Sequence, residues 1–418
     1  MNRIILVGNG FDLAHNLHTS YKDFMDWYWS QWVYKLRTCH DRYISDGLCS
    51  FILRNENSSW SSYFFHNIRY IMSEVSDKNI IEELRKHSIC SVKFKPLMER
   101  IVKSLNINNW VDIETEYYQC LLNPKSTPIA ELNKELDTIR ALLIEYLTTI
   151  SSPIINPQLK NFIQDPIIKE DIAVTSLAVW KDFINERLKF DLNQWKPILY
   201  KYGMEPIYDE YDIRFASYAG IETKDEYSFE DLDKMQKLKT SKFALLPDNI
   251  MLLNFNYTNL ADQSLPNDES FSIIHIHGEL TNPSSVIFGY GDEMDEGYET
   301  LKRKNDNEYL KHMKTARYLE TNNYRRMLTF VESAPYQVYI MGHSCGNSDR
   351  TLLNTLFEHP NCVSIKPFYY EDKKSGKDNY LDIVQNISRN FTDAKKMRDR
   401  VVNKMYCQPL PQMDEENA

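Results

Sequence analysis

The spacing of apolar positions changes twice along the chain and divides it into three parts. Residues 4–7 form a short apolar run that ends at Gly8, which is typical of a buried strand in a parallel sheet. Aromatic residues then recur at helical spacing over 21–37. From about residue 40 to 245 the pattern is helical, without obvious clusters of strand residues. We therefore expect one strand and one helix, followed by a large helical block.

One helix of this block has clear ends. Thr127 can cap it and Pro128 suits its first position. Apolar residues then recur at alternating intervals of three and four, at Ile129, Leu132, Leu136, Ile139, Leu143 and Tyr146. This spacing predicts an amphipathic helix that packs against others.

A third pattern begins near residue 248, where short apolar runs alternate with helical segments. The expected strands are 250–255, 272–276, 286–288, 337–341 and 362–369, and the expected helices are 303–332, 349–358 and 380–404. The strand at 4–7 cannot be stable alone, so we expect it to join the later ones in one sheet. The prediction is an α/β fold with a Rossmann-like parallel sheet. Its discontinuous core comprises 1–25 plus 245–405, with a mostly helical insertion at 26–244 and a flexible acidic tail at 406–418.

Charge and cysteine content exclude several classes of protein. The net charge is −10, so we do not expect a nucleic-acid binder, which needs clustered Lys and Arg. Seven scattered Cys without a C-x-x-C pair argue against a zinc ribbon and favour free thiols in a reducing cytoplasm. The apolar run at the N-terminus is too short for a signal peptide, and no stretch is apolar enough to span a membrane. We expect a cytoplasmic protein.

The first candidate site follows the first strand directly, in the segment Gly8-Asn9-Gly10-Phe11-Asp12. Two glycines between a buried strand and a helix allow a tight turn and close approach of the backbone to a phosphate. Leu13 stands where the full dinucleotide motif has a third glycine. A tight turn that binds no ligand is therefore the alternative.

Asparagines and histidines end the next two expected strands. Asn254 and Asn256 lie at the carboxyl end of 250–255, where α/β folds bind ligands and where Asn is also common in turns. His275 and His277 stand two residues apart, and His277 precedes a glycine, which suits a general base. Two such histidines could also hold a metal, but the sequence offers no clear third ligand, and we predict none.

The last candidate site is the loop after 337–341, which begins at Gly342 and contains Ser344 and Asp349. Its G-x-S-x-G sequence matches the nucleophile elbow of serine hydrolases. That reaction also needs a histidine on a later strand, and the one histidine that follows, His359, lies in or next to the adjacent helix. We prefer a nucleotide-binding turn, in which Ser344 and Asp349 contact ribose or phosphate.

Together these motifs resemble the AbiH family of bacterial abortive-infection (anti-phage) proteins. The resemblance rests on residues 8–12 with Leu17, Thr19, Ser20 and Tyr21, and on the later motifs at 255–258, 276–278 and 342–349. AbiH proteins in turn resemble the sirtuin-like, NAD-binding fold of other phage-defence proteins. Thr258 departs from that pattern, which has Asp at this position. The paired zinc cysteines of sirtuin deacylases are absent, which favours an NAD-consuming enzyme.

The resemblance implies that the protein cleaves the nicotinamide–ribose bond of NAD to arrest infected cells. Asn256 and His277 would be catalytic, with Asn256 positioning the ribose or water and His277 activating a hydroxyl or water. The residues implied in binding the nucleotide are Gly8, Asn9, Gly10, Phe11, Asp12, Asn254, Gly342, Ser344 and Asp349. Glu114 and Glu116 could reach the site, but we expect both on a helix surface.

Two other functions remain open from the sequence. The chain could bind a nucleotide without turnover, as a sensor that recruits partners, or it could be a serine hydrolase that uses Ser344. The expected partners are the nucleotide substrate, a phage-derived trigger or companion defence protein, and further copies of the chain in a homo-oligomer. No membrane partner is expected.

Overall fold

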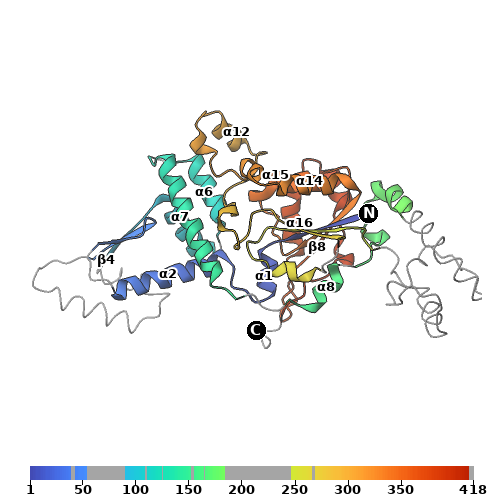
Figure 1. Cartoon of the computed structure of the whole chain (residues 1–418), viewed down its shortest axis with the longest axis horizontal. Coiled ribbons are helices and arrows are strands. Elements are labelled where there is room, and N and C mark those ends of the chain that lie inside the picture. The colour runs from blue at the N-terminus through green and yellow to red at the C-terminus, as the bar shows by residue number, and fades with distance from the viewer. Residues whose placement is uncertain are drawn as a thin grey trace, which may run out of the picture.

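A five-stranded parallel sheet forms the centre of the protein (Figure 1). The computed structural model describes residues 1–38, 43–53, 90–108, 111–124, 126–151, 155–163, 165–183, 246–265 and 269–413. The strands are β1 (Asn2–Val7), β5 (Ile250–Asn254), β6 (Phe271–His275), β7 (Tyr336–Met341) and β8 (Cys362–Phe368). The predicted α/β fold with a parallel sheet is confirmed, and the first strand pairs with strands from the last third of the chain.

The strand order is β6-β5-β1-β7-β8, with β1 in the middle. After β1, the chain adds β5 and β6 on one side of it and then β7 and β8 on the other side. Ile4 of β1 faces Met251 of β5 on one side and Val338 of β7 on the other. Between β1 and β7 the order therefore reverses. In open parallel sheets, ligands bind beyond the carboxyl ends of the strands at such a switch point.

Helices cover both faces of the sheet, as the fully buried strands require. Alternate residues such as Ile4 and Ile5 of β1 belong to separate apolar clusters on the two faces. One face carries α14 (Asn323–Ser333), α15 (Arg350–Phe357) and α16 (Tyr380–Arg389), and the other carries α1 (Asn9–Ala14) and α8 (Pro157–Ile163) (Figure 1). Helix α8 packs on the sheet although it lies within the stretch 26–244.

The part between β1 and α8 packs beside the sheet around its own apolar cluster. The helices that the structure describes there, after α1, are α2 (Tyr21–Thr38), α5 (Pro96–Asn108), α6 (Ile113–Leu122) and α7 (Ile129–Thr148). The predicted helix that begins at Ile129 is confirmed as α7, although Pro128 is its N-cap and no side chain caps it.

The expectation that this part contains no strands is wrong. A three-stranded antiparallel sheet is formed by β2 (Tyr43–Ser45), β3 (Cys49–Leu53) and β4 (Cys90–Phe94). β2 and β3 form a hairpin around Asp46-Gly47, a turn signal that the sequence-based prediction did not use, whereas β3 and β4 lie far apart in sequence.

Two further expectations after residue 248 need correction. Residues 286–288 are buried but join no sheet, because the amide of Ile287 bonds to the carbonyl of His277 instead. The expected helices at 303–332 and 380–404 are interrupted. They comprise α13 (Lys314–Arg317), α14, α16 and α17 (Ala394–Arg400), and α12 (Glu296–Lys302) precedes them. Short 3-10 turns are 169–171, 174–176, 260–264, 283–285, 307–309, 318–320, 347–349 and 404–406.

The C-terminal segment runs back across the core. Leu410 is buried and its amide donates to the carbonyl of Tyr369, and the amide of Met413 donates to Ala14. The last five residues of the expected acidic tail, 414–418, lie outside the described residues. Of the helices that the structure describes, none has the length and apolar character needed to cross a membrane.

Candidate functional site

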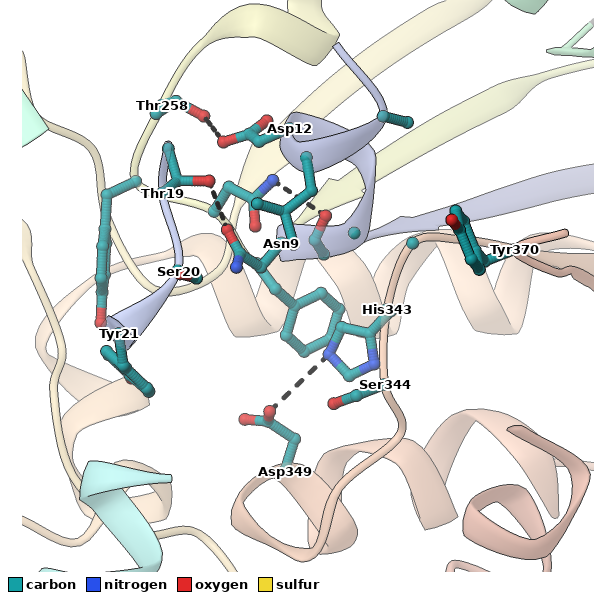
Figure 2. A pocket seen from close by; sticks show the side chains of 18 of the residues that line it. Asn9, Asp12, Thr19, Ser20, Tyr21, Thr258, His343, Ser344, Asp349 and Tyr370 are labelled. Carbon is teal, nitrogen blue, oxygen red and sulfur yellow. Dashed lines mark hydrogen bonds and ion pairs between the residues drawn. The ribbon is translucent and has the colours of Figure 1, made fainter. Parts of the chain in front are cut away.

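A cavity of about 670 Å³ lies at the switch point, beyond the carboxyl ends of β1, β5 and β7 (Figure 2). All four sequence motifs contribute to its wall. Of the predicted site residues, those that line it are Gly8, Asn9, Gly10, Asp12, Asn256, His277, Gly342, Ser344 and Asp349. Phe11 and Asn254 are buried behind the wall. The size is that of a small-molecule site.

The two glycine loops pack directly against each other. The amide of Gly10 donates to the carbonyl of Gly342 at 2.8 Å, and a Cβ on Gly10 would lie 2.8 Å from that oxygen. Gly342 has φ +76°, and a Cβ there would lie 2.0 Å from the amide nitrogen of Phe11. The glycines are therefore required by the contact between the loops themselves, and the amide of Gly10 already has a protein partner.

The carboxylate of Asp12 forms part of the cavity wall next to the loop after β5. Thr258 donates its hydroxyl to Oδ2 of Asp12 at 2.6 Å (Figure 2). This contact gives a physical reason for Thr at position 258, because Asp in its place would set two carboxylates against each other in a buried site. Burial raises the pKa of Asp12 to about 6, although Thr258 and the Asn256 amide act to lower it.

Of the two asparagines, only Asn256 faces the cavity. Its Nδ2 donates to the carbonyl of Gly8 at 3.1 Å, which ties the loop after β5 to the first glycine loop. Asn254 is fully buried; its Oδ1 accepts from the amide of Asn256 and its Nδ2 donates to the carbonyl of Thr258. Asn254 thus shapes the loop that carries Asn256.

The two histidines have separate surroundings. Nε2 of His275 lies 3.0 Å from Asp262, and His275 does not line the cavity. Nε2 of His277 lies 3.1 Å from Oδ1 of Asp349 and 3.1 Å from the hydroxyl of Tyr318. No group of three or more His, Cys, Asp or Glu that could hold a metal ion occurs among the residues that the structure describes.

Asp349 is held in the wall by a lysine that the sequence did not single out. Lys314 of α13 is fully buried, and its Nζ lies 2.9 Å from Oδ1 of Asp349 and 2.8 Å from Oε2 of Glu114. From the sequence, Asp349 is assigned a contact with ribose or phosphate, and that contact stays a prediction. In the structure Asp349 joins Lys314 to His277.

Glu114 is part of this buried cluster and not of a helix surface. It lies in the first turn of α6, next to the capping residue Asp112. Its Oε1 accepts from the amide of Gly289 at 3.0 Å. Glu116, two residues on, pairs with Arg100 at 2.7 Å and does not line the cavity. Helix α6 thus contributes one of the buried carboxylates of the site.

The charges of the cluster follow from one ammonium facing two carboxylates. Burial opposes the ionisation of Asp349, but Lys314 and His277 outweigh it and hold its pKa well below the usual range. Burial raises the pKa of Glu114 to about 7, against the opposing effect of Lys314. Burial, and then the Lys314 charge, lower the pKa of His277. At neutral pH the ion pair is therefore Lys314 with Asp349, and His277 is neutral.

The orientation of His277 suits a general base. A hydrogen on Nε2 satisfies the carboxylate of Asp349, which favours this tautomer and leaves the lone pair of Nδ1 to accept a proton. Nδ1 makes no hydrogen bond within the part of the chain that the structure describes. The arrangement is an aspartate–histidine pair at the wall of a cavity.

The surroundings of Ser344 do not match those of a serine nucleophile. Besides Gly342, the residue of its loop with a left-handed backbone is Cys345, with φ +54°, whereas a nucleophile elbow strains the serine itself. Nδ1 of His343 accepts from the amide of Cys345, and its Nε2 faces Asp349 at 3.7 Å. His359 pairs with Glu332 at the amino end of β8, the opposite end of the sheet. Neither histidine is placed to activate the Ser344 hydroxyl.

Comparison with known proteins identifies a family. A family model described as "Bacteriophage abortive infection AbiH" matches residues 4–370, which is most of the chain and includes every residue of the cavity wall up to Tyr370. No curated protein and no solved structure shows significant similarity to the chain. The chain therefore belongs to the AbiH family of bacteriophage abortive infection proteins.

Proposed function

We propose that this AbiH protein acts against bacteriophages by hydrolysing the bond between nicotinamide and ribose in NAD. The reaction would take place in the cavity at the switch point. Loss of NAD would stop the growth of an infected cell. The observation that carries the proposal is the buried His277–Asp349 pair, at the position where a Rossmann-like sheet binds nucleotides.

The chemistry requires a base and a site that favours positive charge. The bond between C1′ and the pyridinium nitrogen breaks, its electron pair goes to nicotinamide, and the ribosyl group passes through an oxocarbenium-like state. Water then bonds to C1′ and gives a proton to Nδ1 of His277. Burial and Lys314 keep the imidazole neutral before this step. Asp349 orients the imidazole and stabilises the imidazolium that forms.

The charge of the cavity wall fits such a transition state. The wall contains the carboxyl groups of Asp12, Asp112, Glu114 and Asp349, and no Lys or Arg occurs among the described residues that line it. Fixed negative charge in a buried site stabilises a developing carbocation and suits the cationic nicotinamide ring of oxidised NAD. The same wall is unfavourable for a triphosphate. The pyrophosphate of NAD would depend on backbone amides and on polar side chains such as Ser344.

Asn256 is the second side chain to which we assign a role in the reaction. It lines the cavity beside the first glycine loop, and its side chain is fixed by the bond to Gly8. In the proposed reaction it positions the ribose or the attacking water. A phage-derived trigger, a companion protein and a homo-oligomer stay predictions from the sequence.

The proposal is tested in infected cells, where any trigger is present. Cells that express the wild-type chain, His277→Ala or the matched control His275→Ala are infected, and their NAD content is followed beside phage yield. We expect NAD to fall in cells with the wild type and with His275→Ala, whose histidine lies outside the cavity wall, and to remain in cells with His277→Ala. Protection against phage with an unchanged NAD content would contradict the proposed reaction.

A further inference from the structure

Asp12 is a buried carboxylate, and one of its two oxygens makes no hydrogen bond within the described part of the chain. Its side chain is 1% exposed, and Oδ2 accepts the hydroxyl of Thr258 at 2.6 Å. Oδ1 has no hydrogen-bond partner among the residues that the structure describes. Burying a carboxylate is costly unless its oxygens are paired, so an open oxygen at this depth calls for a partner from outside the chain.

The open oxygen belongs to a residue of the cavity wall. Asp12 lines the cavity together with Asn256 and Ser344, and Figure 2 shows it beside Thr258 and across the first glycine loop from Tyr370. An unpaired carboxylate oxygen does not by itself indicate a ligand contact, as a second carboxylate shows. Asp262 also has an unpaired Oδ1, but it pairs with His275 and does not line the cavity.

The negative charge of Asp12 determines which chemical groups of a ligand it can contact. A carboxylate repels phosphate, so Asp12 does not share the role of the glycine loop on which it lies. It can accept a hydrogen bond from an O–H or N–H group. In NAD these donors next to the scissile bond are the ribose hydroxyls and the carboxamide of nicotinamide.

We propose that Asp12 is a substrate-binding residue, whose Oδ1 accepts a hydrogen bond from a donor group beside the bond that is cleaved. The inference rests on the proposed function and extends it, because it assigns to Asp12 the recognition of the nicotinamide riboside half. Thr258 is then a positioning residue, since its hydroxyl holds Oδ2 and thereby fixes the carboxylate in the cavity wall.

The test is calorimetric titration of the full chain with NAD and with nicotinic acid adenine dinucleotide, whose carboxylate replaces the carboxamide. The proteins are the wild type, Asp12→Asn and the matched control Asp262→Asn. Loss of a charge-assisted hydrogen bond should weaken NAD binding about 10- to 100-fold in Asp12→Asn. Asp262→Asn should bind NAD within about twofold of the wild type, because its carboxylate lies outside the cavity.

The two ligands distinguish the two donors. If the carboxamide is the donor, the wild type rejects the acid form and Asp12→Asn accepts it. If a ribose hydroxyl is the donor, Asp12→Asn weakens the binding of both ligands alike. Wild-type affinity for NAD in Asp12→Asn would overturn the inference and leave the proposed function standing. A wild-type chain that binds neither ligand, even with extract of infected cells, would overturn both.

Discussion

Replacing Lys314 by Met removes the positive charge at the centre of the buried cluster. Lys314 is fully buried, and its Nζ lies within 3 Å of a carboxylate oxygen from Glu114 and from Asp349. Loss of one partner of a buried ion pair typically costs about 3–5 kcal/mol, because the remaining charge stays buried and unpaired. We expect Lys314→Met to lower the free energy of unfolding at pH 8 by this amount.

The loss should depend on pH in a defined direction. Without the ammonium, the pKa of Glu114 rises further and the pKa of Asp349 rises from its lowered position, so the folded variant holds protons that its unfolded chain releases. Its stability therefore falls as the pH rises, and the deficit relative to the wild type is smaller at pH 5 than at pH 8. The measurement is urea unfolding, followed by tryptophan fluorescence, at both pH values.

Two variants serve as controls for this prediction. Lys404→Met removes a lysine whose side chain is 51% exposed and pairs with Asp378, and it should leave the free energy of unfolding nearly unchanged, because solvent screens the pair. Lys314→Met combined with Glu114→Gln should recover much of the loss, because one of the two uncompensated carboxylates is then neutral. A cost for Lys314→Met no larger than that for Lys404→Met, or a deficit independent of pH, would refute the reasoning.

Three further predictions concern the loops and the wall of the cavity. Gly342→Ala should destabilise the protein by about 1–3 kcal/mol more than Gly376→Ala in urea unfolding, since both glycines have positive φ but only a Cβ at Gly342 meets backbone; equal effects would exclude the loop contact as the cause. Asp12→Asn should be more stable than the wild type above pH 6, by up to about 3 kcal/mol. Burial raises the Asp12 pKa from 3.8 to about 6, so the wild type loses stability as the pH rises through that range. Parallel stability profiles of the two proteins from pH 4 to 7 would contradict that pKa. Ser344→Ala should raise the KM for NAD but leave kcat nearly unchanged, because Ser344 is assigned to binding and not to the reaction. Neither protein should react with a fluorophosphonate probe, and labelling of the wild type that the variant loses would support a serine hydrolase instead.

The arrangement of the core could be predicted because its motifs stand at the ends of strands. Apolar runs that end in Gly8, Asn254 and Gly342 indicate buried parallel strands, and such strands place their carboxyl ends at one edge of a sheet. This geometry brings Asn256 and His277 to the same cavity as the two glycine loops. The position of the cavity could therefore be predicted from the local spacing within each motif, without knowledge of the contacts between distant segments.

The buried ion cluster could not be predicted, because tertiary packing alone creates it. Glu114 lies in the acidic first turn of a helix, a position that is usually solvated. Lys314 is one of several lysines in a segment that resembles a surface helix. Nothing local in either segment indicates that the two side chains meet across 200 residues of sequence. The pairing of β3 with β4 could not be predicted for the same reason, since it spans a long separation, whereas the hairpin of β2 and β3 has a local signal in Asp46-Gly47.

The release of nicotinamide from NAD tests the central claim most directly. Purified chain is incubated with NAD, alone and with an extract of phage-infected cells, and free nicotinamide and ADP-ribose are quantified beside His277→Ala and Asn256→Ala. We predict equal amounts of both products from the wild type and almost none from His277→Ala. Intact NAD in both incubations would contradict the account, and NAD that stays bound without turnover would make the chain a nucleotide sensor.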